Sequence, residues 1–123
     1  MNNADNVALA EEHVIWLHPD GTRVRGSIFL GPPITVRPDE VHCMVSLKGV
    51  NYLTIPMLAS SPLQAILLAV RHLGMGIHDF MYRGGHVLDP RNGENFGIEH
   101  LFGPLLRHPP DGPPPGDDDD DPA

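Results

Sequence analysis

The sequence predicts an α+β domain, with a four-stranded, mostly antiparallel sheet, one main helix packed on it and a C-terminal hairpin. Three observations support this prediction. Apolar and polar residues alternate in the first half of the chain, one strongly capped apolar helix follows, and 123 residues leave room for one core. We expect the domain to span 10–108, between a flexible N-terminus at 1–9 and a disordered, Pro/Asp-rich acidic tail at 109–123.

The first two strands are predicted on either side of a tight turn at 19–22. The run 12–18 is rich in β-branched and aromatic residues, which favour strands. Pro-Asp-Gly-Thr matches a hairpin turn, and apolar and polar residues then alternate over 23–30. Gly-Pro-Pro at 31–33 is expected to end this second strand. Its buried face would carry Val24, Gly26 and Ile28, and its other face Arg23, Arg25 and Ser27.

A third strand is predicted over 41–48 and a fourth over 52–58. The third alternates with a period of two, as a sheet with one covered face requires. Pro56 lies inside the fourth strand and has no N–H to donate, so we expect that strand to be an edge, to be bulged or to end early. In the third strand the core face would carry Val41, Cys43, Val45 and Leu47, and the other face His42, Met44, Ser46 and Lys48.

The clearest local signal predicts a helix over 62–73. Ser61 and Gln64 match a capping box, in which the serine oxygen accepts from the N3 amide and the glutamine reaches back to the Ser61 amide. Pro62 suits the first helical position, and Gly74 is expected to end the helix in a left-handed conformation. We expect the helix to be covered on more than one side. One apolar face would carry Leu63, Ile66, Leu67, Val70 and Leu73, and a second Ala65, Leu68 and Ala69.

The signals weaken after this helix. Residues 78–82 fit a strand or a loop. A hairpin is predicted from two short segments, 85–88 and 94–98, on either side of the turn-forming residues 89–93. One helical turn is expected at 98–102.

The formal charge of −8 is concentrated in the tail. Residues 109–123 hold six of the sixteen acids and no Lys or Arg, whereas the remaining 108 residues hold ten acids and eight bases. A body this close to neutrality lacks the basic stripe that nucleic-acid binding requires, so we expect no nucleic-acid partner. We assign the tail a solvating role, with an electrostatic arm for a basic partner as the alternative.

Cysteine content and targeting signals favour the cytoplasm. Cys43 is the single cysteine, which excludes a disulfide framework, and the first ten residues lack the regions of a signal peptide. The stretch 52–70 has 19 residues without a charge, about the length of a membrane span. Pro56 and the capping residues inside it indicate a strand followed by a helix, so we expect no membrane partner.

No motif of a known reaction is present. Gly-x-Ser-x-Gly, a phosphate-binding loop, Cys-x-x-Cys and His-Glu-x-x-His are all absent. Cys43 lies on a predicted core face, where a thiol is usually inert. Eight histidines are the one compositional oddity, and His78, Asp79 and His86 are the candidates for a metal-dependent enzyme. Because nothing in their spacing fixes convergence, we expect no metal site and no other cofactor.

A longer pattern runs through the helix and the segment after it. It consists of a curled β-meander, a helix of the form Ser-x-x-Gln-Ala-x-x-Leu-Ala-x-x-x-Leu-Gly, and a Gly-Gly turn before a closing strand. The residues that carry it are Ser61, Gln64, Ala65, Leu68, Ala69, Leu73, Gly74, Gly84 and Gly85. Over about half of its length the chain thus resembles a family of small bacterial proteins of unknown function. The resemblance implies this fold and a bacterial origin, assigns no catalytic residue, and by analogy suggests an immunity or accessory factor.

These observations predict a non-enzymatic binding module, an immunity or accessory protein that binds and neutralises a protein partner such as a toxin. The alternatives are a small metal-dependent enzyme that uses the histidine and aspartate cluster, and an assembly component of a phage or secretion system with the uncharged helix at an interface. The predicted partner-binding residues are Arg23 and Arg25 on one strand face and Asp117, Asp118, Asp119, Asp120 and Asp121 in the tail.

Overall fold

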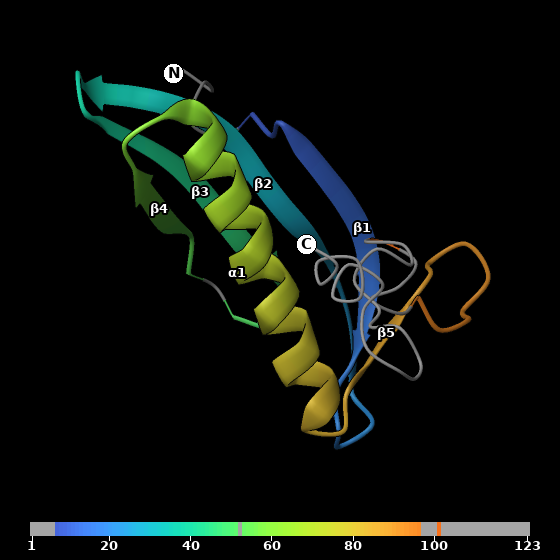
Figure 1. Ribbon diagram of the computed structural model, residues 1–123. Helices are drawn as coiled ribbons and strands as arrows, with labels where there is room; N and C mark the ends of the chain where they lie inside the picture. Colours follow the sequence, from blue (N-terminus) through green and yellow to red (C-terminus); the bar gives the residue numbers. More distant parts are fainter. Residues whose placement is uncertain (1–6, 52, 97–100, 102–123) are drawn as a thin grey trace, which may run out of the picture.

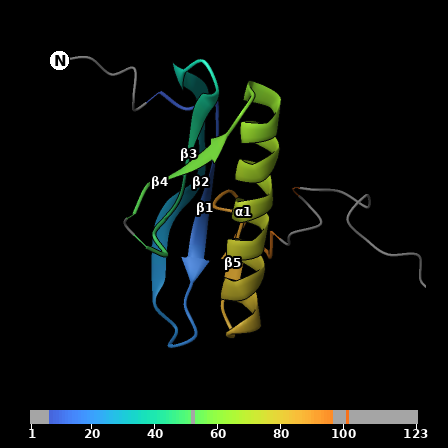
Figure 2. The ribbon, with the colours of Figure 1, turned by 60° about the vertical axis from the view of Figure 1, so that its left-hand side comes forward.

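Five antiparallel strands form one sheet, and a helix crosses one face of it (Figure 1). The computed structural model describes residues 7–51, 53–96 and 101. The strands follow the order β4-β3-β2-β1-β5, and Figure 2 shows the sheet and the helix as two layers. The elements are β1 (Ala10–Leu17), β2 (Arg23–Arg37), β3 (Glu40–Lys48), β4 (Ile55–Ala59), α1 (Pro62–Tyr82) and β5 (His86–Leu88).

The predicted α+β class, with one helix on an antiparallel sheet, is confirmed, but the predicted count of four strands is wrong. A fifth strand, β5, joins the sheet beside β1 and pairs only with its last three residues, from Ile15 to Leu17. The short run after the Gly-Gly turn is therefore part of the same sheet. It leaves most of the length of β1 without a neighbour on that side among the described residues.

β2 does not end at Gly-Pro-Pro, where the sequence predicted a stop. A β-bulge absorbs these residues, since Leu30 pairs with Val45 and the next pair joins Pro33 to Cys43, which leaves one extra residue on β2. The pairing of β1 with β2 reaches no further than Leu30. Both prolines thus lie where β2 has, in the described part of the chain, no partner strand on the β1 side, which is an edge position where proline is tolerated.

The alternation predicted for the third strand is confirmed on β3. Its four core positions, from Val41 to Leu47, are all buried on the face that α1 covers. β4 lies at one end of the sheet, so of the three alternatives predicted for the strand that holds Pro56, the edge strand is the one present. The uncharged stretch divides into β4 and α1, and no helix among the described residues is long and apolar enough to cross a membrane.

The start of the helix is confirmed and its end is not. The Ser61 side chain accepts from the Gln64 amide at 3.2 Å, and Pro62 occupies the first helical turn. The Gln64 side chain accepts from the Ser60 amide at 2.8 Å, one residue before the predicted donor. α1 continues through Gly74 to Tyr82, and the left-handed glycine beyond its end is Gly84, with φ at +102°. The strand or loop predicted at 78–82 is therefore helical.

Of the two apolar faces predicted for the helix, the first is not the buried one, whereas Ala65 and Ala69 of the second are fully buried. The residues of α1 that are fully buried are Ala65, Ala69, Leu73, Ile77 and Phe80. Of the first predicted face, only Leu73 belongs to this set. Leu63 and Leu67 are 66% and 59% exposed, so the helix is not covered on more than one side by the described residues.

Trp16 is the largest fully buried side chain and explains a glycine on the neighbouring strand. Its indole Nε1–H donates to the Lys48 carbonyl at 2.6 Å, and its ring meets the edge of Phe80 at 5.2 Å between centroids. A Cβ built on Gly26 would clash with the Lys48 carbonyl oxygen and lie 2.7 Å from the indole nitrogen. Position 26 therefore requires glycine, because the Lys48 backbone carbonyl and the indole that donates to it leave no room for a Cβ.

The turn of the predicted C-terminal hairpin is present within the described residues. The Asp89 amide donates to the Glu94 carbonyl, the Phe96 amide donates to the Val87 carbonyl, and Gly93 has φ at +76°. The end of the predicted return segment at 97–98 lies outside the described residues. So do most of the helical turn predicted at 98–102, the N-terminus up to residue 6 and the acidic tail at 109–123.

Candidate functional site

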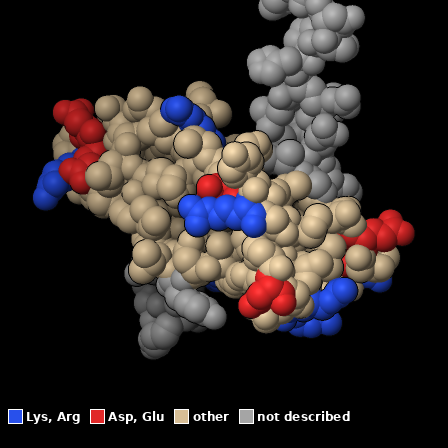
Figure 3. Space-filling view, turned by 90° about the horizontal axis from the view of Figure 1, so that it is seen from below, with Lys and Arg blue, Asp and Glu red and all other residues tan. Residues whose placement is uncertain are grey.

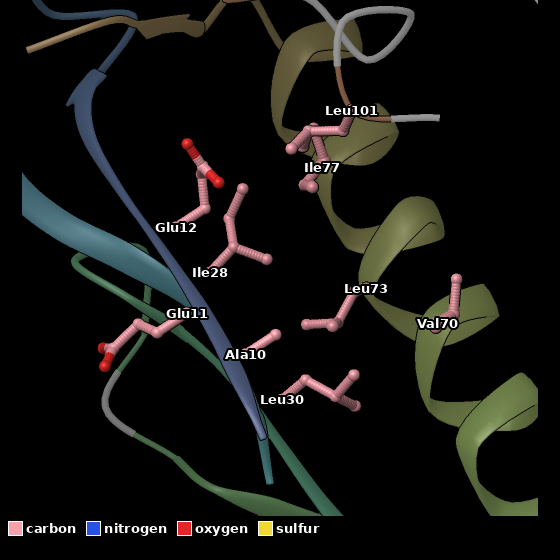
Figure 4. Close-up of a pocket in the computed structure, with 9 residues that line it drawn as sticks. All are labelled: Ala10, Glu11, Glu12, Ile28, Leu30, Val70, Leu73, Ile77 and Leu101. Atoms are coloured by element: carbon pink, nitrogen blue, oxygen red, sulfur yellow. The ribbon is translucent and has the colours of Figure 1, made fainter. Parts of the chain in front are cut away.

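An apolar groove lies between α1 and the first half of β1. Its volume is 290 Å³ and it is open to solvent (Figure 4). Ile28 and Leu73 are buried in its floor, while Leu30 and Val70 are half-buried along its sides. The full lining consists of Ala10, Glu11, Glu12, Ile28, Leu30, Val70, Leu73, Ile77 and Leu101.

The groove exists because the helix and the short last strand do not cover the whole sheet. α1 packs chiefly on β3, β2 and β4, towards one side of the sheet. On the other side, β5 accompanies β1 only from Ile15 to Leu17. The helix-facing surface of β1 and β2 between Ala10 and Leu30 is therefore left partly open, and Leu101 lies at its margin.

The outer edge of β1 beside this groove has no partner among the described strands. From Ala10 to Val14 the strand pairs with β2 on one side, and no described strand pairs with it on the other. Each residue of such a strand directs its N–H and C=O to one edge, and the direction alternates along the chain. Unpaired backbone donors and acceptors are thus available in a row next to an apolar surface.

Two adjacent glutamates on this edge have different surroundings. Glu11 faces away from the helix, where its carboxylate accepts from the Ser27 hydroxyl at 2.6 Å and lies 3.6 Å from Lys48 Nζ. The Ser27 hydrogen bond, opposed by partial burial and aided by Lys48, lowers the pKa of Glu11. Glu12 pairs in register with Ile28 and so lies on the helix side, within the groove. It makes no hydrogen bond or ion pair with any described residue.

A cation lies in the electrostatic neighbourhood of Glu12 but is bound elsewhere. Arg91 makes a two-pronged contact with Asp89, with distances of 3.0 Å from Nε and 2.8 Å from Nη2. The pKa of Arg91 is raised mainly by this hydrogen bonding to Asp89, and to a smaller extent by the charge of Glu12. The Arg91 guanidinium is therefore held by Asp89 and not by Glu12.

The residues predicted to bind a partner do not gather at this groove. Arg23 and Arg25 pair with Leu17 and Ile15, on the face of the sheet opposite the helix, and both are exposed. Neither arginine makes an ion pair with a described residue. Residues 117–121 lie outside the part of the chain that the structure describes. On the face shown in Figure 3, acidic and basic side chains lie in small mixed groups, with uncharged surface between them.

The residues of the alternative metal hypothesis are not brought together. Among the described residues, no group of three or more His, Cys, Asp or Glu side chains can hold a metal ion. His78 and Asp79 are exposed on α1, and Asp79 pairs with Arg83 at 3.1 Å, whereas His86 lies on β5.

The single thiol is a core group, as predicted. The Cys43 side chain is fully buried and its thiol donates to the Gly31 carbonyl, with 3.2 Å between sulfur and oxygen. Burial raises the pKa of Cys43, which keeps the thiol protonated and poorly nucleophilic.

Sequence reasoning did not find the groove. Its apolar residues come mainly from β1, β2 and α1, and periodicity within single elements places only Ile28, Val70 and Leu73 of them on an apolar face. One signal for an open edge was available in the sequence. The segment predicted at 85–88, before the turn at 89–93, is too short to pair with the whole of β1. Glu12 also stands at a position that alternation with Val14 and Trp16 assigns to the covered face.

Comparison of the chain with protein-family models, with curated proteins and with solved structures gives no match. The resemblance to a family of small bacterial proteins therefore stays an expectation from the sequence.

Proposed function

We propose that this protein is a small bacterial binding module without enzymatic activity, of the immunity or accessory type, which recognises a protein partner at the groove. The observation that supports this is the combination of an open apolar groove with a strand edge along its margin that no described strand pairs with. Protein partners commonly bind to such a combination, because the strand edge forms backbone hydrogen bonds with the partner and the groove receives its side chains.

The chemistry of the groove favours a peptide chain over a small metabolite. A metabolite site usually encloses its ligand and presents several convergent polar groups. Here the surface is open, and of the groove-lining side chains Glu12 is the one charged group that faces the helix side. A module of this kind binds and does not turn over a substrate.

The remaining charged residues have secondary roles in this proposal. Asp117 to Asp121 form an acidic run that would attract a basic partner from a distance and accelerate association. Arg23 and Arg25 offer a separate contact on the other face of the sheet. A cytoplasmic setting fits the single buried cysteine.

Site-specific photo-crosslinking in cells of the source organism tests this function. A benzophenone amino acid at Ala10, on the groove margin, is expected to give one discrete adduct. The same group at Tyr82, which is 84% exposed at the far end of α1, serves as the matched control. The partner found at position 10 must then form a stoichiometric complex with the purified protein. Absence of any adduct specific to Ala10 would refute the proposed function.

The assembly alternative is favoured by a different observation and is kept as a second candidate. The outer face of α1 exposes Leu63, Leu67, Met75 and Tyr82, which is unusual for a helix with water on that side. If this face forms a subunit interface, the purified protein should associate in sedimentation experiments at micromolar concentration. Leu67→Lys should then abolish the association.

A further inference from the structure

We propose that the partner enters the groove as an extended segment. The segment adds to β1 as a new strand along Ala10–Val14 and sets a Lys or Arg side chain against Glu12. This inference rests on the proposed function and gives the partner segment a defined chemistry.

The backbone of β1 offers the first part of the recognition. β5 pairs with the last three residues of β1, and no described strand pairs with the rest of that edge. A segment that follows the line of β5 would extend the same edge over Ala10–Val14 and complete the missing part of the fifth strand. The other end of the sheet is less suited to strand addition, because β4 carries Pro56, which has no N–H to donate.

Glu12 supplies the charge that selects the segment. Its carboxylate is on the groove side and makes no ion pair or hydrogen bond with a described residue, whereas Glu11 next to it is already bound to Ser27 and Lys48. On one face of an antiparallel pair, side chains directly opposite each other interact, and opposite charges stabilise the pair. A basic side chain opposite Glu12 is therefore favoured, and an acidic one is rejected.

The same charge argues against a second copy of this chain as the occupant. Two β1 edges that pair symmetrically about residue 12 would place the Glu12 side chains of both copies opposite each other. Like charges in directly opposed positions destabilise a strand pair. The edge is thus protected against self-pairing and stays open to a basic partner, which is a common way of gaining specificity.

The apolar part of the groove fixes the next position of the segment. Residues two apart on a strand share one face and are separated by about 7 Å. Ala10 lies two residues from Glu12 on the same face of β1. Its small side chain leaves room between Leu30 and Val70. A large apolar side chain two residues from the basic one would fill this space.

Binding of a designed peptide to the full-length protein tests the inference. The probe is a capped, fluorescein-labelled peptide, Thr-Leu-Thr-Lys-Thr-Leu-Thr, in which the lysine and both leucines share one face. One control peptide has glutamate in place of lysine, and a second has proline in place of the threonine after the lysine. We expect the lysine peptide to bind at least about tenfold more tightly than either control in fluorescence anisotropy.

The location of binding is read by amide NMR shifts and by hydrogen exchange. We expect the amides within Ala10–Val14 that point to the outer edge to become protected when the lysine peptide binds, and those of Ile55–Ala59 on the opposite sheet edge to stay unchanged. Protection at the β4 edge with no change at the β1 edge would overturn the inference.

A charge reversal provides the matched variant. Glu12→Lys should invert the preference, so that the glutamate peptide binds more tightly than the lysine peptide. Asp39→Lys makes the same charge change on an exposed residue in the β2–β3 turn, away from the groove, and should leave the preference intact. Thermal melting of both variants checks that they are folded. An unaltered preference in Glu12→Lys would overturn the inference.

The segment of the chain that follows Leu101 is the rival occupant, since its sequence holds Phe102, Leu105, Leu106 and Arg107. If the wild-type protein binds no peptide but the Leu106→Asp variant binds the lysine peptide, the groove is occupied by the protein's own segment after Leu101. The assignment of the groove to a partner is then overturned. If neither protein binds any peptide while the crosslink at Ala10 still yields a stoichiometric complex, the strand-addition inference fails and the proposed function survives.

Discussion

The two faces of α1 are both apolar, but they are used differently. The inner face carries Ala65, Ala69, Leu73, Ile77 and Phe80, all fully buried against the sheet. The outer face carries Leu63, Leu67, Met75 and Tyr82, each more than half exposed. Over its first nine residues the helix has no charge, so hydrophobicity alone does not identify the face that packs.

The difference between the faces lies in side-chain size. In the first half of α1, alanines meet the sheet and leucines point outward. Further along, a Cβ on Gly76 would lie 2.8 Å from the nearest methyl carbon of Leu47, so the helix also approaches β3 closely there. Small residues allow the helix backbone to lie near the sheet, and this closeness selects the inner face. The comparison teaches that the face with the larger hydrophobes is not always the buried one.

The largest effect is expected from removing a large side chain on the inner face. Ile77→Ala should destabilise the protein by about 2–5 kcal/mol, because Ile77 is 1% exposed and a cavity would remain in the core cluster that also holds Leu47 and Trp16. Midpoints of urea unfolding measure this loss. Met75→Ala, on the outer face two residues away, is the control and should cost under about 1 kcal/mol. Equal losses for the two variants would remove the distinction between the faces.

The next effect comes from enlarging a small inner residue. Ala69→Leu adds a side chain as apolar as its neighbours but leaves no room for it, since Ala69 is fully buried. Overpacking of this kind should cost about 1–3 kcal/mol in chemical denaturation. A stability gain would mean that the close approach of helix and sheet is not what selects the inner face.

The helix cap should give a smaller effect that is independent of either face. The Ser61 hydroxyl accepts from the Gln64 amide, and Ser61→Ala would leave that donor to water. We expect a loss of about 1 kcal/mol in the free energy of unfolding. Ser60→Ala, at the preceding exposed residue, is the control and should be neutral, because only the amide of Ser60 takes part in the cap. A larger loss of stability from Ser60→Ala than from Ser61→Ala would show that Ser60, and not Ser61, caps the helix.

The smallest effect is expected on the outer face. Leu67→Lys keeps a good helix former at a site that is 59% exposed, so folding stability should change by no more than about 0.5 kcal/mol. Thermal and urea unfolding of the monomeric protein both read this. A loss of 2 kcal/mol or more would place Leu67 back in the core, where the helical spacing of leucines first put it.

The sequence by itself determined the elements whose signals are local. Alternation determined the faces of β3 and of the first part of β2, and Ser61 and Pro62 determined where α1 begins. Pro56 limited β4 to an edge, a bulge or an early end, and the structure has the edge. Each of these follows from a period of two, a cap or a missing N–H, which act within a few residues of one another.

The tertiary structure alone decided what depends on distant neighbours. β2 passes through its prolines because β1 ends beside them. α1 continues through Gly74 and Gly76 because β3 and β5 pack below it. The alanines of α1 face inward because the sheet lies close to the helix. The groove beside Glu12 results from the same cause, since it depends on how far β5 accompanies β1. Packing energy between elements overrides local propensity, and it arises from contacts that no single segment of the sequence contains.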